Sequence, residues 1–272
     1  MAVIPPNNYL LCKKAAKKDY FTMSIKILDP HIHLFDLNQG DYFWLQPEQA
    51  PFWPDKPTIA KNVNEGDLQV TSSLALAGFV HIEAGFDNQQ PWRELDWLEA
   101  TCNLPFKTVA FADITHKDFH QQLNTLTQRP SLVGIRHILD EQACTILSAK
   151  NTLLHLSALA SNGLSFDAQL NLTDTLGVEA LLACAKKTPH LSIIINHGGW
   201  PPFKTDKDDS NRYTAWLQNL HKLATCKNIA IKVSGWEMLD RQWQPAFLHT
   251  VLLDCLMAFG RKRVMLASNF PL

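Results

Sequence analysis

Residues 25–33 read Ile-Lys-Ile-Leu-Asp-Pro-His-Ile-His, and this stretch indicates where the fold begins. Successive side chains of a β-strand point to opposite faces, so Ile25, Ile27, Asp29, His31 and His33 share one face. The row starts with apolar residues and ends with ionisable ones. This order predicts a strand that starts in a core and ends at a site where polar side chains gather.

Further short apolar runs follow this strand along the chain, separated by segments of helical periodicity. Such alternation is typical of βα units around a parallel sheet. We expect eight strands, at 25–29, 77–83, 107–113, 132–139, 164–170, 191–197, 229–234 and 264–270. Helices are expected at 94–101, 119–127, 152–161, 176–186, 213–224 and 246–259, with a further one within 62–76. Eight units in a chain of 272 residues predict the α/β class and a single (β/α)₈ (TIM) barrel.

The two ends of the chain depart from this pattern. Residues 1–22 place their basic residues after a short apolar patch, which is not the order of a signal peptide, so we interpret them as a disordered leader or extension. The barrel then occupies residues 23–272, and the sequence stops directly after the eighth strand, without an eighth helix. We expect a truncated product that exposes apolar surface at this edge and forms a homodimer through it.

Composition restricts the class of partner. The formal net charge is −1, which does not favour nucleic acid or an anionic membrane as a partner and favours a small-molecule substrate. The six cysteines form no metal-binding or redox motif, so we expect reduced thiols in a cytoplasmic protein. No apolar run approaches the ~20 residues of a membrane span.

The segment 39–57 combines Tyr42, Trp44 and Trp53, among other aromatic residues, with four prolines. Prolines prevent a continuous helix, while the aromatic rings favour burial. Two interpretations remain open: a lid over the substrate, or a loop packed against the barrel rim.

Catalytic groups of a barrel gather at the carboxyl ends of its strands, which is where His31 and His33 fall. Two imidazoles at this spacing can ligate one metal ion or hold one anionic group. His197 follows three isoleucines at the end of the sixth expected strand, so we expect it in the same site.

Polar residues also end the remaining strands. Arg136 suits carboxylate recognition, but it would equally form a structural ion pair with Asp167. A buried carboxylate such as Asp167 needs a partner. We further expect substrate contacts from the following side chains: His81, Glu83 and Lys232.

Six motifs, in this order, resemble the amidohydrolase superfamily, specifically its branch of sugar-lactone hydrolases and 2-pyrone-4,6-dicarboxylate hydrolases. They are Asp-Pro-His-Ile-His with Leu-Phe-Asp (29–36), Gly-Ile-Arg (134–136), Leu-Ser-Phe-Asp (164–167), Asn-His-Gly-Gly-Trp-Pro (196–201), Lys-Val-Ser-Gly (232–235) and Ser-Asn-Phe-Pro (268–271). The resemblance implies a hydrolase in which His31, His33 and His197 surround the reacting group and Arg136 holds a substrate carboxylate or carbonyl.

One residue departs from the superfamily pattern. The superfamily carries an aspartate at the end of strand eight, where this chain has Asn269. An amide cannot accept a proton near neutral pH, so Asn269 can orient water but cannot act as the general base. The other groups that could accept the proton are Asp167, His197, His33 and Glu83, of which we favour Asp167 because burial would raise its pKa.

Three hypotheses follow. The first is a lactonase in which the imidazoles and Arg136 polarise the ring ester without a metal. The second is a metal-dependent amide or imide hydrolase, or a decarboxylase, with zinc on His31, His33 and His197. The third is a catalytically impaired barrel that only binds a small molecule.

Overall fold

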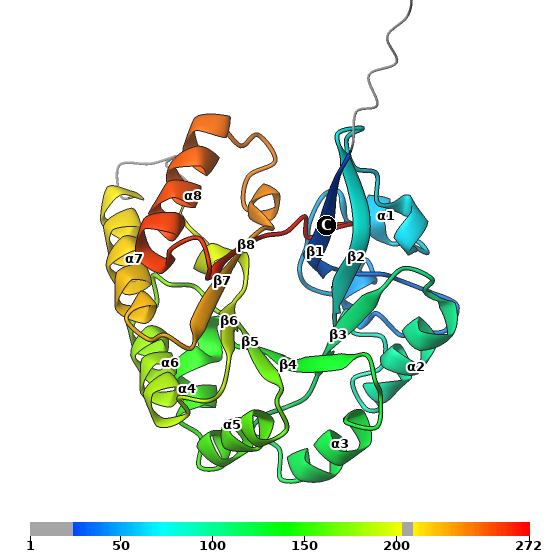
Figure 1. Cartoon of the computed structure of the whole chain (residues 1–272), viewed down its shortest axis with the longest axis horizontal. Helices are drawn as coiled ribbons and strands as arrows, with labels where there is room; N and C mark the ends of the chain where they lie inside the picture. The colour runs from blue at the N-terminus through cyan, green and yellow to red at the C-terminus, as the bar shows by residue number, and fades with distance from the viewer. Residues whose placement is uncertain (1–23, 203–208) are drawn as a thin grey trace, which may run out of the picture.

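The computed structural model describes residues 24–202 and 209–272, and eight parallel strands form one sheet in the order β1 to β8. The strands are β1 (Ile25–Ile32), β2 (Leu74–Ile82), β3 (Phe106–Phe111), β4 (Leu132–Ile138), β5 (Ser165–Gln169), β6 (Ile193–Ile195), β7 (Ile229–Val233) and β8 (Val264–Leu266). Each predicted strand overlaps an observed one. Figure 1 shows the strands arranged around a common centre with helices outside them, which confirms the (β/α)₈ barrel.

The helices follow the strands as a barrel requires. They are α1 (Lys56–Ile59), α2 (Trp92–Thr101), α3 (Phe119–Leu126), α4 (Ala143–Leu147), α5 (Thr152–Ser161), α6 (Thr175–Lys187), α7 (Asp209–Ala224) and α8 (Pro245–Phe259). The predicted helix 152–161 has the observed bounds, and the end of α5 shows why. Gly163 follows it with φ 68°, a left-handed conformation that glycine adopts without strain.

One predicted helix is wrong. The segment 62–76 holds only a three-residue turn, Glu65–Asp67, in which Asn64 caps the backbone N–H of Gly66 and Asp67 bonds back to Asn64. β2 then begins at Leu74, earlier than predicted. The polar side chains of this segment satisfy the backbone locally, so no longer helix is needed. The short helices α1 and α4 were not predicted, because each is too brief to show a period.

The barrel closes through a segment beyond β8. Asn269 has φ 59°, which ends the extended conformation and makes β8 shorter than the predicted 264–270. Phe270 nevertheless pairs with Ile32 of β1, and its carbonyl accepts the backbone N–H of His33 at 2.7 Å. In Figure 1 the chain runs from β8 to a C-terminus beside β1. This crossing brings Asn269 to the end of β1.

No α-helix follows β8 in the described part of the chain. Apolar side chains are exposed on the two strands that flank the closure: Leu28 of β1 is 71% exposed and Leu266 of β8 is 64% exposed. Elsewhere α3 to α8 pack a continuous apolar core against β3 to β7, which fixes the positions of the strand ends. A second, smaller cluster joins β1 and β2 to the segment 42–63.

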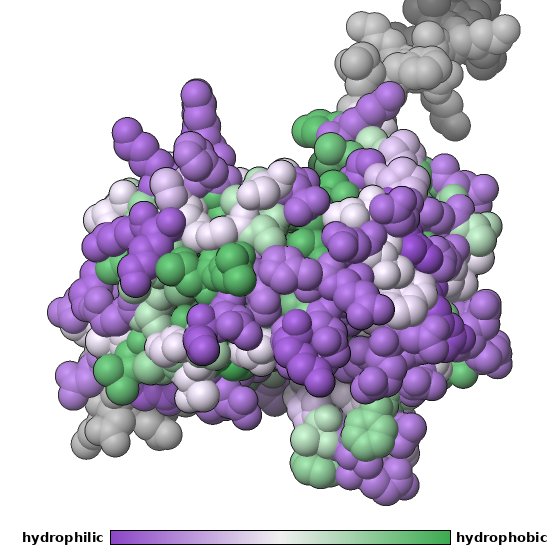
Figure 2. Space-filling model, turned by 90° about the horizontal axis from the view of Figure 1, so that it is seen from below, coloured by the Kyte–Doolittle hydropathy of each residue, from purple (hydrophilic) through white to green (hydrophobic). Residues whose placement is uncertain are grey.

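None of the helices in the described ranges has the length and apolar character to cross a bilayer. On the face shown in Figure 2, polar residues predominate and apolar residues form small separate groups. The cysteines within the described residues are all free thiols. The predicted leader, residues 1–22, lies outside the described residues.

Candidate active site

Two histidines meet at the carboxyl end of β1. His31 and His33 are both buried, and their Nε2 atoms lie 3.2 Å apart. The Nδ1 atom of His33 lies 2.8 Å from the carbonyl oxygen of Ile82, an atom that can only accept. His33 therefore carries its proton on Nδ1, and its Nε2 lone pair accepts the Nε2–H of His31.

His197 completes the histidine cluster from a turn rather than from a strand. β6 ends at Ile195, and His197 has φ 54° at the start of a short turn. Its ring centroid lies 4.7 Å from that of His31, and it stacks on Trp200 at 4.5 Å. Its Nδ1 lies 3.1 Å from the hydroxyl of Ser234. Gly235 is required beside it, since a Cβ there would lie 2.5 Å from the imidazole.

Arg136 and Glu83 form a buried ion pair across the cavity mouth. Nε of Arg136 lies 2.7 Å from the Glu83 carboxylate, and one terminal nitrogen donates to the Glu83 carbonyl at 2.8 Å. The other terminal nitrogen donates to Gln169 at 3.3 Å. A guanidinium has five N–H donors, so two are left over for a substrate oxygen. Arg136 thus pairs with Glu83, not with Asp167 as one interpretation of the sequence had it.

The cavity above the histidines has a volume of about 390 Å³. Of the residues expected to be functional, His33, His197, Arg136, Glu83 and Asn269 line it. Trp44, Pro51 and Trp53 line it as well, so part of the aromatic segment 39–57 does cover the site. The same segment also packs on the rim, since Tyr42 is buried and the Trp44 indole donates to the Ala84 carbonyl at 2.7 Å.

Four expected site residues do not line this cavity: His31, His81, Asp167 and Lys232. Lys232 lies 2.6 Å from Asp167, and Asn196 donates to the same carboxylate oxygen at 2.8 Å. Both members of this pair are almost fully buried, and neither lines the cavity. Each buried charge thus has its partner in the other, through one of the two Asp167 carboxylate oxygens.

His81 faces away from the cavity. Its Nε2 lies 2.9 Å from a carboxylate oxygen of Glu94 on α2, and its Nδ1 accepts the backbone N–H of Leu34. Both ring nitrogens are therefore used in joining β2 to α2 and β1. Glu83, two residues later, does line the cavity, because it follows the end of β2 and strand alternation no longer sets the direction of its side chain.

Asp140 is a site residue that the sequence interpretation missed. It lies in the turn after β4, has φ 35° and lines the cavity. The Gln169 amide donates to it at 3.2 Å, and Trp200 also bonds it. Burial raises the pKa of this carboxyl above its ordinary value. A carboxylate directly after a barrel strand was the available signal.

The histidines should make the fold acid-sensitive. Burial, with contributions from nearby cations, lowers the pKa of His31 and His33 well below 6.5 and that of His197 to about 3. The unfolded chain then binds more protons than the folded one below pH ~6.5, so the free energy of unfolding decreases as the pH is lowered. Each such histidine should account for about 2 kcal/mol at pH 5. Urea unfolding at pH 7, 6 and 5 measures this loss.

The raised pKa values of Glu83 and Asp140 act in the opposite sense between the ordinary carboxyl pKa and their raised values, so they offset part of the loss from the three histidines. His190 is exposed and provides the control: His190→Asn should leave the pH dependence unchanged. Equal free energies of unfolding at pH 7 and pH 5 would contradict neutral, buried imidazoles.

Comparison with known proteins identifies the family. The Amidohydrolase family model matches residues 28–272, which is most of the chain. This chain belongs to the amidohydrolase family. An uncharacterised Sinorhizobium fredii protein is 30% identical, with 91% of this chain and 85% of that protein covered. An L-fucono-1,5-lactonase of Burkholderia ambifaria is 26% identical, with 87% and 80% covered.

Solved structures agree with the fold. An amidohydrolase from Burkholderia multivorans, solved with bound zinc, has a TM-score of 0.73 at 18% identity, covering 90% of this chain and 84% of that one. The amidohydrolase family expected from the six motifs is confirmed, and the protein is a hydrolase.

Members of the amidohydrolase superfamily typically depend on a metal, and the structure from Burkholderia multivorans contains zinc. The Nε2 atoms of His31 and His33 lie close enough to share one cation. Among the described residues, however, no group of three or more His, Cys, Asp or Glu side chains is placed to hold an ion. Asn269 supplies an amide where a carboxylate would balance the charge of the ion, and the Arg136 guanidinium adds a second positive charge in the same cavity. These donors do not fit a zinc ion.

Proposed function

We propose that this amidohydrolase opens the ring ester of a small sugar lactone by attack of water. The observation that carries the proposal is one cavity that holds free N–H donors of Arg136, the imidazole of His197 and a carboxyl with a raised pKa, Asp140. Ester hydrolysis needs these three functions: an oxyanion donor, a second polarising group and a proton acceptor.

The charges around the cavity favour a neutral lactone over a carboxylated one. Arg136 is balanced by Glu83 at 2.7 Å, and Asp140 adds a second carboxyl without a paired cation among the described residues. The histidines are neutral near pH 7, because burial lowers their pKa. A substrate carboxylate would therefore have no uncompensated positive charge to pair with. The hydroxyls of a sugar, in contrast, would form hydrogen bonds with amides and carboxylates.

The proposed reaction starts with the lactone carbonyl against the free N–H groups of Arg136. The reaction uses the tautomer of His197 in which Nδ1 accepts the Ser234 hydroxyl and Nε2 carries the proton, so that Nε2 donates to the same oxygen. Asp140 takes a proton from the water that attacks the carbonyl carbon. The ring C–O bond then breaks, and the proton returns from Asp140 to the departing alkoxide, giving an open hydroxy acid.

His31 and His33 have a positioning role in this proposal. The Nε2–H of His31 points to His33, whose own proton is held by the Ile82 carbonyl, so neither donates to the oxyanion in this arrangement. His31 nevertheless acts on the site through its ring, which packs against the imidazole of His197. We therefore assign the oxyanion contacts to His197 and Arg136.

The test is hydrolysis of a lactone panel by metal-analysed protein. The panel contains neutral sugar γ- and δ-lactones, carboxylated pyrones and muconolactones, with acid release followed by pH indicator. We expect turnover of neutral sugar lactones that is unchanged by a chelator. Loss of turnover with the chelator, restored by zinc, would instead support the metal-dependent hydrolase. Turnover by Asn269→Asp but not by the natural protein would support the impaired barrel.

Asp140→Asn tests the proton acceptor. An amide cannot accept the proton, so kcat should fall about 10²–10⁴-fold. In the natural protein, kcat should decline as pH falls through a pKa above the ordinary 3.8 of an aspartate, because only the ionised carboxylate accepts a proton. Glu141→Gln is the control at pH 7, since Glu141 is exposed and does not line the cavity; because its charge helps to raise the pKa of Asp140, the variant should move the decline of kcat to lower pH without lowering kcat at pH 7. Equal losses in the two variants would contradict the assignment.

A further inference from the structure

A second cavity, of about 410 Å³, lies beside the candidate active site. It is formed by the loop after β2, the start of α2, the end of β3 and the helix α3. Asn88 lines both this cavity and the active-site cavity, so the two are adjacent at this residue. Its volume is within the ~300–1,000 Å³ usual for small-molecule sites.

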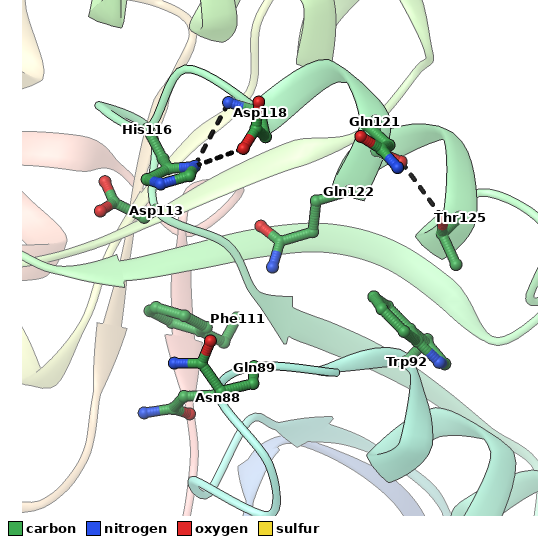
Figure 3. Close-up of a pocket in the computed structure, with 10 residues that line it drawn as sticks. All are labelled: Asn88, Gln89, Trp92, Phe111, Asp113, His116, Asp118, Gln121, Gln122 and Thr125. Atoms are coloured by element: carbon green, nitrogen blue, oxygen red, sulfur yellow. Dashed lines mark hydrogen bonds and ion pairs between the residues drawn. The ribbon is translucent and has the colours of Figure 1, made fainter.

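Two aromatic side chains give the cavity an apolar surface. Trp92 and Phe111 are half-buried, and Figure 3 shows the amide of Gln122 between their rings. In the same view Asn88 and Gln89 lie below Phe111, and Asp113 lies above it. An aromatic surface with amides around it suits a ring that is apolar on its C–H face and polar at its edge.

The amides in this cavity have unused hydrogen-bonding capacity. Within residues 24–202 and 209–272, the side chains of Asn88, Gln89 and Gln122 make no hydrogen bond or ion pair to protein. Asp113 bonds Thr115 through one carboxylate oxygen, which leaves the second oxygen as an acceptor. Amides donate and accept, so this set matches hydroxyl groups, which also do both.

The charge of the cavity excludes an anionic occupant. Its ionisable residues are Asp113, Asp118 and His116, and no lysine or arginine lines it. The one imidazole already faces Asp118 at 3.8 Å. A phosphate or carboxylate would meet two carboxylates without a free cation, whereas a neutral polyol would meet acceptors and amides.

We infer that this cavity binds a neutral sugar ring. Resting on the proposed function, the inference extends the substrate: a glycosyl lactone, with its lactone in the active site and a second sugar ring between Trp92 and Gln122. The shared residue Asn88 lies where the linkage between the two rings would pass. The protein would then prefer disaccharide lactones to monosaccharide lactones.

The kinetic experiment compares two substrates, lactobionolactone (a galactosyl gluconolactone) and gluconolactone. The measured quantity is the ratio of their kcat/KM values. Gln122→Ala should lower this ratio about fivefold, as expected for the loss of one or two neutral hydrogen bonds, and Gln89→Ala should lower it similarly. Asn124→Ala is the matched control, because Asn124 is exposed on α3 and does not line the cavity. It should keep the natural ratio.

A binding experiment separates this inference from the proposed function. Saturation-transfer NMR with lactose, which has no lactone, reports occupancy of the sugar site without turnover. We expect a signal that weakens in Gln122→Ala and not in Asn124→Ala. Lactose binding of this kind without any lactone hydrolysis would overturn the proposed function and leave the sugar site supported. Lactone hydrolysis with an unchanged ratio in Gln122→Ala and no lactose signal would overturn the sugar site alone.

Discussion

Replacing His197 should lower kcat/KM for sugar lactones about 10²–10³-fold, the usual effect of removing one oxyanion donor. Two variants separate catalysis from backbone strain. His197 has φ 54°, a conformation that asparagine tolerates better than alanine. His197→Asn therefore keeps the turn, but its shorter side chain cannot place a donor where Nε2 lies. Both variants should lose activity to a similar extent.

The control for His197 is His190→Ala, because His190 is exposed on the turn before β6. It should retain full activity. The loss should appear in kcat rather than in KM, since the oxyanion forms only in the transition state. Full activity in His197→Asn would remove His197 from the reaction, while a loss confined to His197→Ala would indicate that only the turn was disturbed.

Breaking the Arg136–Glu83 pair should have the largest effect on stability. Both side chains are about 95% buried, and their charged atoms lie 2.7 Å apart. Arg136→Met leaves the Glu83 carboxylate buried without its cation, which should lower the free energy of unfolding by about 3–5 kcal/mol. Burial raises the pKa of Glu83 even with Arg136 present, so the unpaired carboxyl should protonate more readily still. Chemical denaturation of the variant measures the loss.

The double variant Arg136→Met/Glu83→Gln separates stability from function. With no charge left unpaired, most of the lost free energy of unfolding should return, whereas activity on lactones should not, because the donors for the substrate carbonyl are gone. Arg129→Met is a matched control, since Arg129 pairs with Asp96, which is half-exposed. Its cost should stay below about 1 kcal/mol. Recovery of activity in the double variant would show that Arg136 acts only on the fold.

The sequence predicted the barrel because that information is local. Apolar runs, helical periods and a glycine such as Gly163 are read within a few residues, and they place the strands whatever the rest of the chain does. The same reasoning placed His31, His33 and Arg136 at the carboxyl ends of strands. It also identified Asn269 as the residue that departs from the superfamily pattern.

Side-chain partners were beyond the reach of the sequence, because they join residues that are far apart in the chain. Lys232 reaches Asp167 across 65 positions, and Arg136 reaches Glu83 across 53. Two of the expected functional residues, Asp167 and Lys232, are therefore held in a buried pair. The histidine protonation pattern has the same origin, since it depends on the Ile82 carbonyl beside His33.

The sequence by itself thus determined the eight strands, their order and the end of the barrel where polar groups gather, because strand and helix periodicity are properties of short segments. Only the tertiary structure decided which polar groups face the cavity. Residues such as His197, Asp140 and Glu83 lie just past strand ends, where side-chain alternation no longer applies. Their direction is set by turns, by burial and by partners brought from other strands.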